Sequence, residues 1–203
     1  MTTLLPPRDA LAESQRLIAT IEERRGDLPL ADRLLAIHRP THRALESSYD
    51  RSEQAVAAWR AALAQRWECE VAGRRIYKRI LRQIVERHGG EDAPEVQLLS
   101  RGGAEADSSP AELLADLRRL HAALAVGAGG PAAGEQLVEI ERVCGALESA
   151  IADVRLCETQ RRVAVLDTRL ASEAYRRARA ETRRLLAEHY GEQMASVLGD
   201  LLE

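Results

Sequence analysis

Two long stretches of this chain have apolar residues at steps of three and four, and they limit the possible folds most strongly. The first stretch runs from Pro40 to His88 and the second from Glu135 to His189. The apolar seam of the second stretch includes Leu147, Val154, Val163, Leu166 and Leu170. Residues at these steps fall on one side of an α-helix, so each stretch predicts a long amphipathic helix. A helix of about 50 residues reaches roughly 75 Å. We therefore expect helices that either bend or form an elongated bundle.

The composition favours an all-α fold. Aromatic residues make up 3% of the 203-residue chain and Phe is absent, so Leu, Ala, Val and Ile must form the core. Ala and Leu are the best helix formers among the apolar residues. A β-sandwich core would instead favour β-branched and aromatic side chains.

Two shorter helices are expected, one before each long stretch. Pro7 suits the first turn of a helix that ends near Gly26, because proline lacks only an N–H that has no helical partner there. A short segment over residues 29–38 follows, and Pro40 then opens the first long helix. Gly73, the one glycine inside that helix, is a candidate for a bend.

The second short helix has a clearer beginning. Ser109 and Glu112 form the pattern of a capping box, in which each side chain accepts from the backbone of the other residue. We expect this helix to run to about Val126. The glycine-rich segment 127–134 is then a loop, because it follows a helix and lacks the lysine of a phosphate-binding loop.

The two halves of the chain match each other in order, which indicates a tandem duplication. Similar residues recur at a separation that falls from 103 to 102 to 101: Pro7 and Pro110, Ala44–Ser47 and Ala146–Ser149, Arg75, Lys78 and Arg82 with Arg176, Arg179 and Arg183, and His88 with His189. The units are residues 1–100 and 104–203, joined by a linker over 100–109. The alternative is chance similarity between two amphipathic stretches.

Charge is segregated along each long helix, with acidic residues early and basic residues late. This order suits the helix dipole, and it also suits two long helices packed antiparallel. A pseudo-twofold axis between the units would produce that pairing. With each short helix packed at one end, the expected fold is an elongated four-helix bundle made from two helical hairpins.

Few residues suggest catalysis or metal binding. His38 and His42 lie four apart, but Pro40 is between them and no third ligand is evident, so we expect a solvent-facing or partly packed pair. His88 and His189 are interpreted as residues at helix C-termini. The three cysteines, Cys69, Cys144 and Cys157, have neither disulfide nor zinc spacing and are interpreted as buried small hydrophobes. We expect no metal, no cofactor and no enzymatic activity.

The basic residues that recur in both halves are the main candidate contacts. Arg75, Lys78 and Arg82 share one helix face, as do Arg176, Arg179 and Arg183. Three interpretations remain open. In the first, the side chains are solvated or paired within the chain; in the second, they bind an acidic protein; in the third, they bind phosphate groups of nucleic acid or lipid.

The two tryptophans are the main apolar candidates. Trp59 and Trp67 lie eight residues apart, nearly on one face of the first long helix. They form an interface if that face is exposed, and part of the core if it is internal. No candidate signal peptide or membrane span is present, and the cysteine usage suits a reducing cytoplasm.

The sequence thus favours a non-enzymatic helical scaffold or adaptor that works through protein–protein contacts, with a homo-oligomer expected. Lys78 is the only lysine among many arginines, which is typical of a GC-rich bacterial genome. The first alternative is a nucleic-acid or polyanion binder that uses the basic residues. The second is a helical bundle that binds a ligand in a cavity.

Overall fold

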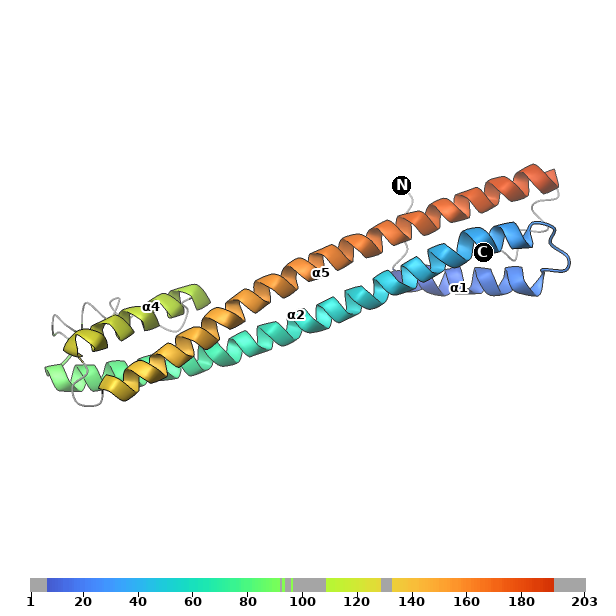
Figure 1. Cartoon of the computed structure of the whole chain (residues 1–203). Helices are drawn as coiled ribbons and strands as arrows, with labels where there is room; N and C mark the ends of the chain where they lie inside the picture. The colour runs from blue at the N-terminus through green and yellow to red at the C-terminus, as the bar shows by residue number, and fades with distance from the viewer. Residues whose placement is uncertain (1–6, 92, 94–95, 97–108, 129–132, 192–203) are drawn as a thin grey trace. The chain divides into compact units, whose positions relative to one another are not determined.

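The computed structural model describes residues 7–91, 93, 96, 109–128 and 133–191, and helices make up its regular structure throughout that part. Within the described residues, four α-helices follow one another: α1 (Pro7–Glu23), α2 (Ala31–His88), α4 (Pro110–Ala123) and α5 (Ala133–Tyr190) (Figure 1). A turn of π-helix, Leu124–Ala128, follows α4. The all-α prediction is confirmed. None of the described helices is both long enough and apolar enough to cross a membrane.

The helix α2 begins nine residues before the predicted start at Pro40. That prediction is wrong, because the expected short segment and the long helix are one continuous helix of 58 residues with Pro40 inside it. Proline removes a backbone donor from the helix and leaves carbonyl groups without their usual partner. The carbonyl that loses its donor is that of Ala36, four residues before the proline. The hydroxyl of Thr41 donates to the next two carbonyls, those of Ile37 and His38, at 3.1 and 2.9 Å.

The helix ends follow the local sequence. Ser109 and Glu112 form the predicted capping box: the Glu112 N–H donates to Ser109 Oγ, and the Ser109 N–H donates to Glu112 Oε2. α2 ends at His88, and Gly89 then takes a left-handed φ of 83°. The Gly90 N–H donates to the carbonyl of Val85 at 3.1 Å, which is the bond that closes a Schellman motif.

The chain divides into two compact units, each of which contains part of both long helices. Unit 1 comprises residues 1–57 and 160–203, and unit 2 comprises residues 58–159. They therefore differ from the two halves proposed from the repeat, 1–100 and 104–203. The predicted linker 100–109 lies outside the described residues except for Ser109.

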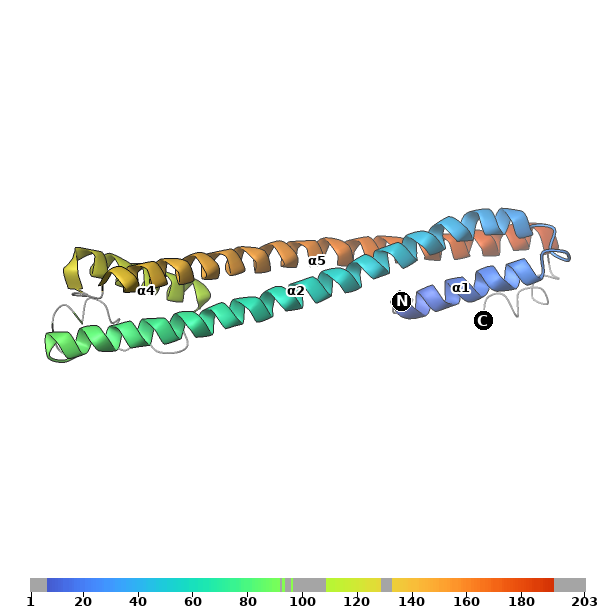
Figure 2. The same cartoon turned by 60° about the horizontal axis from the view of Figure 1, so that its bottom comes forward.

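In unit 1, α1 packs beside the first part of α2 and the last part of α5 (Figures 1 and 2). Leu17 and Ile21 of α1 share a buried cluster with the leucines at the start of α2 and the end of α5. A second cluster joins Ala10, Leu45 and Tyr175. Residue numbers along the core rise on α2 and fall on α5, because Leu34 shares a cluster with Leu186, whereas Leu45 shares the next one with Tyr175.

In unit 2, α4 packs against the last part of α2 and the first part of α5. Its buried side chains meet Ile76, Ile80 and Ile84 of α2 and Ile140, Val143 and Leu147 of α5 in one cluster. Gly73 of α2 is buried and faces α4. A Cβ there would stand 3.3 Å from side-chain atoms of both Leu113 and Leu117. The glycine predicted to mark a bend thus lies within a continuous helix, where its missing side chain leaves room for α4.

The buried side of α5 differs from the predicted apolar seam. Its buried positions include Ile140, Val143, Leu147, Ala150 and Val154, at alternating steps of three and four, as in a heptad repeat. The seam proposed from sequence also included Val163, Leu166 and Leu170, which are 53%, 58% and 63% exposed. That part of the prediction is wrong, because α5 has two apolar stripes with similar spacing and only one of them packs inward.

Candidate interaction surfaces

The first set of predicted basic residues lies on the surface of unit 2. Arg75, Lys78 and Arg82 are all exposed on α2. None of the three forms an ion pair with a residue that the structure describes. The neighbouring Arg79, one step around the helix, instead pairs with Glu139 of α5. The three exposed cations therefore keep their charges available to a partner.

The second set is divided between surface and interior contacts in unit 1. Arg183 is exposed, and Arg176 lies 4.0 Å from Glu173 on its own helix. Arg179 is different, because its side chain is only 19% exposed and pairs with Glu13 of α1. One residue of this set thus joins two helices of the core, so the two basic sets have different environments.

The two tryptophans also differ from each other. Trp59 is partly buried on α2, whereas Trp67 is 64% exposed. Val71, one helical turn beyond Trp67, is exposed as well. Trp67 thus presents a large apolar side chain to solvent in unit 2, while Trp59 is half-buried.

A further apolar surface lies on α5 in unit 1. Val163, Leu166 and Leu170 are more than half exposed and follow each other at steps of three and four. Residues at these steps lie within about 60° of one another around a helix. They form one outward face, which we call the leucine face. Large apolar side chains clustered on a surface are typical of protein interaction sites.

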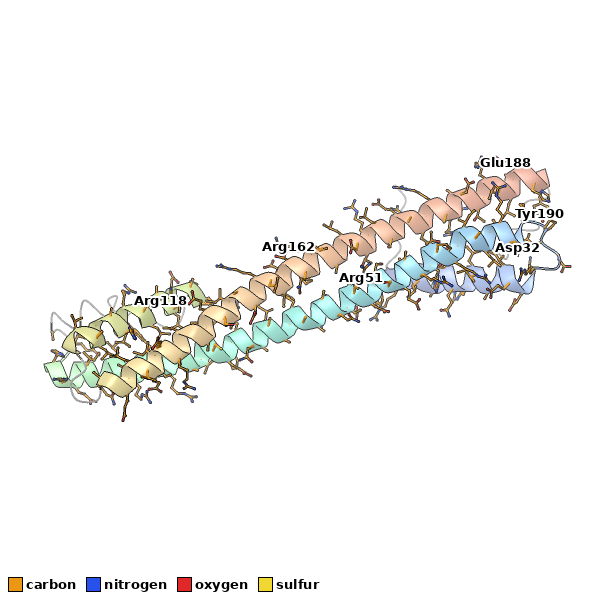
Figure 3. The ribbon with its side chains drawn as sticks, in the orientation of Figure 1. Asp32, Arg51, Arg118, Arg162, Glu188 and Tyr190 are labelled. Carbon is orange, nitrogen blue, oxygen red and sulfur yellow. The ribbon has the colours of Figure 1, made fainter. Side chains whose placement is uncertain are left out.

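An open groove runs between α4 and α5 in unit 2. Its volume is about 580 Å³, and its apolar lining consists of Leu114 and Ile151 with several alanines. Arg118 of α4, labelled in Figure 3, pairs with Glu148 of α5 at 2.7 Å beside it. Neither tryptophan lines this groove, and neither do Cys144 and Cys157.

His38 lies in the core of unit 1, contrary to the prediction of a solvent-facing or partly packed pair. It is fully buried, and its Nε2 is 2.7 Å from the hydroxyl of Thr182. Its ring also meets that of Tyr175 edge to face, with 6.3 Å between centroids. Burial, and secondarily the charge of Arg179, lowers the pKa of His38 to about 4. His42, by contrast, is half-buried.

We call the buried polar side chains Ser14, His38 and Thr182 the polar layer of unit 1. The sequence did not predict it, because Pro40 indicates a helix boundary beside His38 rather than a continuous helix. Ser14 of α1 is fully buried too, and burial raises the pKa of Tyr175. The useful signal was the spacing of His38, Leu45 and Ser48, which places all three on one buried face of α2.

The remaining titratable candidates lie at helix ends or beside the cores. His88 and His189 lie in the last turns of α2 and α5, as predicted. Cys69, Cys144 and Cys157 are free thiols and are half-buried rather than fully buried. Burial raises the pKa of the Cys144 thiol. Within the described residues, no group of three or more His, Cys, Asp and Glu side chains is arranged to hold a metal ion.

Comparison with known proteins found no match: neither a family model, nor a curated protein, nor a solved structure resembles this chain.

Proposed function

We propose that this protein is a non-enzymatic helical scaffold or adaptor that works through protein–protein contacts and can self-associate. The observation that supports this proposal is the exposure of large apolar side chains at helical spacing. The leucine face is one example in unit 1, and Trp67 with Val71 is another in unit 2. Single exposed apolar residues are ordinary, but grouped ones are typical of interfaces.

The leucine face gives the most direct test of partner binding. We expect the immobilised chain to retain defined proteins from the cells that express it, and Leu166→Gln with Leu170→Gln to lose them. Because both side chains are exposed, the double variant should keep the helical circular dichroism of the parent. A matched control is Arg177→Gln with Glu188→Gln, two exposed positions on the same helix. Identical retention by all three chains would contradict the proposal.

The alternative function is polyanion binding through Arg75, Lys78 and Arg82. It is supported by their common exposed face and by the absence of ion pairs to described residues. Binding to nucleic acid would weaken steeply as salt rises, because phosphate contacts release counterions. Replacing the three residues by glutamine would abolish that binding. A chain purified at low salt with excess absorbance at 260 nm, lost at high salt, would favour this alternative.

For the architecture, we propose a tandem duplication in which the long helices run antiparallel and a pseudo-twofold axis relates the two hairpins of a four-helix bundle. Three observations support it. α2 and α5 both contain 58 residues, beginning at Ala31 and Ala133. Both end beside a glycine with positive φ. In each unit, contacts pair later positions of α2 with earlier positions of α5, as Arg79 with Glu139 and Ser48 with Thr168 do.

A further inference from the structure

Unit 2 has an outward face on α2 that combines a tryptophan with three cations. Trp67, Val71, Arg75, Lys78 and Arg82 follow each other at steps of four, four, three and four. At about 100° per residue they lie within an arc of about 80°. All five are exposed. We call this surface the tryptophan–basic face.

Unit 2 also has an outward face on α5, with the opposite charge. Its members share an arc of about 80° around the helix. They are all exposed: Val138, Glu141, Gly145, Glu148, Ala152 and Leu156. Val138 and Leu156 are the largest apolar side chains there, at 68% and 58% exposure. Glu148 also pairs with Arg118, but both side chains remain more than half exposed. We call this surface the acidic–apolar face.

The spacing of the two faces matches when they are set antiparallel. From Trp67, eight residues forward lead to Arg75 and seven more to Arg82. From Leu156, eight residues backward lead to Glu148 and seven more to Glu141. With Trp67 opposite Leu156, each arginine therefore lies opposite a glutamate. Lys78 then faces Gly145, where an added Cβ would meet nothing within 4 Å beyond the adjoining backbone of its own helix.

We propose, building on the scaffold function, that the tryptophan–basic face of one copy binds the acidic–apolar face of a second copy. Trp67 packs on Leu156 and Ala152, and the arginine–glutamate pairs set the register. Opposite charges across an interface select the partner and its orientation, while a central aromatic side chain contributes much of the affinity.

The two faces of one copy point away from each other. Ile80 of α2 and Val143 of α5 are buried in one cluster in the core of unit 2, on the sides of their helices opposite the two faces. One partner copy therefore covers only one of the two faces. Such a head-to-tail contact leaves a free face at each end, so copies add until a ring closes or a filament forms.

The first experiment measures the mass of the full chain by light scattering and sedimentation velocity across protein concentrations, at low and high salt. We expect the average mass to rise past that of a dimer as the protein concentration rises, and to fall at high salt. A Trp59→Phe chain leaves Trp67 as the sole tryptophan, and its emission should shift to the blue on assembly.

Charge reversal tests the register. Arg75→Glu with Arg82→Glu gives one variant, and Glu141→Arg with Glu148→Arg gives the other. Each alone places like charges across the contact, so association should weaken about tenfold or more. Mixing the two restores opposite charges at both contacts and should restore assembly. The matched control, Arg43→Glu with Arg177→Glu, makes the same change in net charge at exposed positions of unit 1 and should assemble normally.

Two results would overturn the inference. One is a wild-type chain that stays monomeric at every concentration and salt. The other is assembly that survives both charge reversals while circular dichroism shows that all chains are folded. Low-salt co-purification of nucleic acid with a monomer would assign the cations to phosphate instead. In that case, loss of the retained proteins by the Leu166→Gln, Leu170→Gln variant would still support the scaffold function, because the leucine face lies in unit 1.

Discussion

The buried polar layer of unit 1 has an apolar counterpart in unit 2 under the proposed duplication. A shift of 103 residues pairs Ser14 with Leu117. The shift of 102 between the bounds of α2 and α5, one residue more than the shift at the repeated basic residues, pairs His38 with Ile140 and Ile80 with Thr182. All six side chains are buried. The hydrogen bond between His38 and Thr182 satisfies one ring nitrogen, while Nδ1 of His38 has no partner among the described residues. An unsatisfied buried polar group costs about 1–3 kcal/mol.

Acid should destabilise the fold through His38. Its pKa is about 4 in the folded chain and about 6.5 when unfolded. Between these values the unfolded ring binds a proton that the folded ring does not, so stability falls as the pH falls. We expect a loss of about 2 kcal/mol from pH 7 to pH 5 in urea unfolding. His38→Leu removes the titrating ring and should reduce this pH dependence. An unchanged pH dependence would contradict the assignment.

Replacing the whole polar layer should stabilise unit 1. The triple variant Ser14→Leu, His38→Ile and Thr182→Ile copies the corresponding residues of unit 2. It removes both partners of the His38–Thr182 hydrogen bond together, and such replacements are often neutral or stabilising. We expect an increase of about 1–3 kcal/mol in the free energy of unfolding. His38→Ile alone should instead destabilise the fold, because the hydroxyl of Thr182 loses its partner. A triple variant less stable than this single one would refute the idea.

At the scale of single helices, local signals set where each begins and ends, and tertiary contacts set which side is buried. The capping box at Ser109 and the glycines after α2 and α5 act within a few residues. Pro40 is the exception, since a cost of about 3 kcal/mol for proline inside a helix is offset by packing on both sides of it. Leu34, Leu35 and Leu45 are all buried around that position.

The capping box should contribute measurably to α4. Ser109→Ala removes the oxygen that accepts from the Glu112 N–H, and we expect a loss of about 1 kcal/mol in thermal or urea unfolding. Ser109→Gly should cost only a few tenths of a kcal/mol. Equal losses from the two substitutions would show that the side-chain hydrogen bond is not the cause.

Two glycines in long helices should respond differently to alanine. At Gly145 a Cβ meets nothing within 4 Å, so Gly145→Ala should stabilise the chain by about 1 kcal/mol. At Gly73 the same helix preference is opposed by two 3.3 Å contacts with α4 leucines. We expect Gly73→Ala to be close to neutral and Gly73→Val to cost about 1–3 kcal/mol through overpacking. Urea unfolding at low protein concentration measures both, and equal gains at the two glycines would contradict the close packing.

At the scale of the molecule, each compact unit combines one short helix with parts of both long helices. Equal helix lengths and similar buried positions agree with the proposed duplication, under which the polar layer and the pairing of Arg179 with Glu13 are differences between the two copies. The faces that remain exposed differ between the units as well. The proposed assembly through unit 2 and the proposed partner binding through unit 1 can therefore be tested separately.

Thiol cross-linking tests the antiparallel course of the long helices. In a chain without its native cysteines, Ser48→Cys with Thr168→Cys probes unit 1, and Gln83→Cys with Gln136→Cys probes unit 2. Gln136 donates to Gln83 at 2.7 Å, and Thr168 donates to the Ser48 carbonyl at 3.0 Å. We expect a short cross-linker to join both pairs in the monomer. A crossed pair, Ser48→Cys with Gln136→Cys, serves as the control and should stay unlinked; its linkage would contradict the arrangement.

The sequence by itself determined the helical class, the approximate course of the helices and the capping box. These properties depend on composition, spacing and hydrogen bonds within a few residues. Only the tertiary structure decided which of two similar apolar stripes on α5 is internal, that Trp67 is exposed, and that His38 is buried. The spacing of Leu166 and Leu170 is as regular as that of the buried positions, so periodicity cannot distinguish them. The difference arises from contacts between helices far apart in the chain, which no local pattern records.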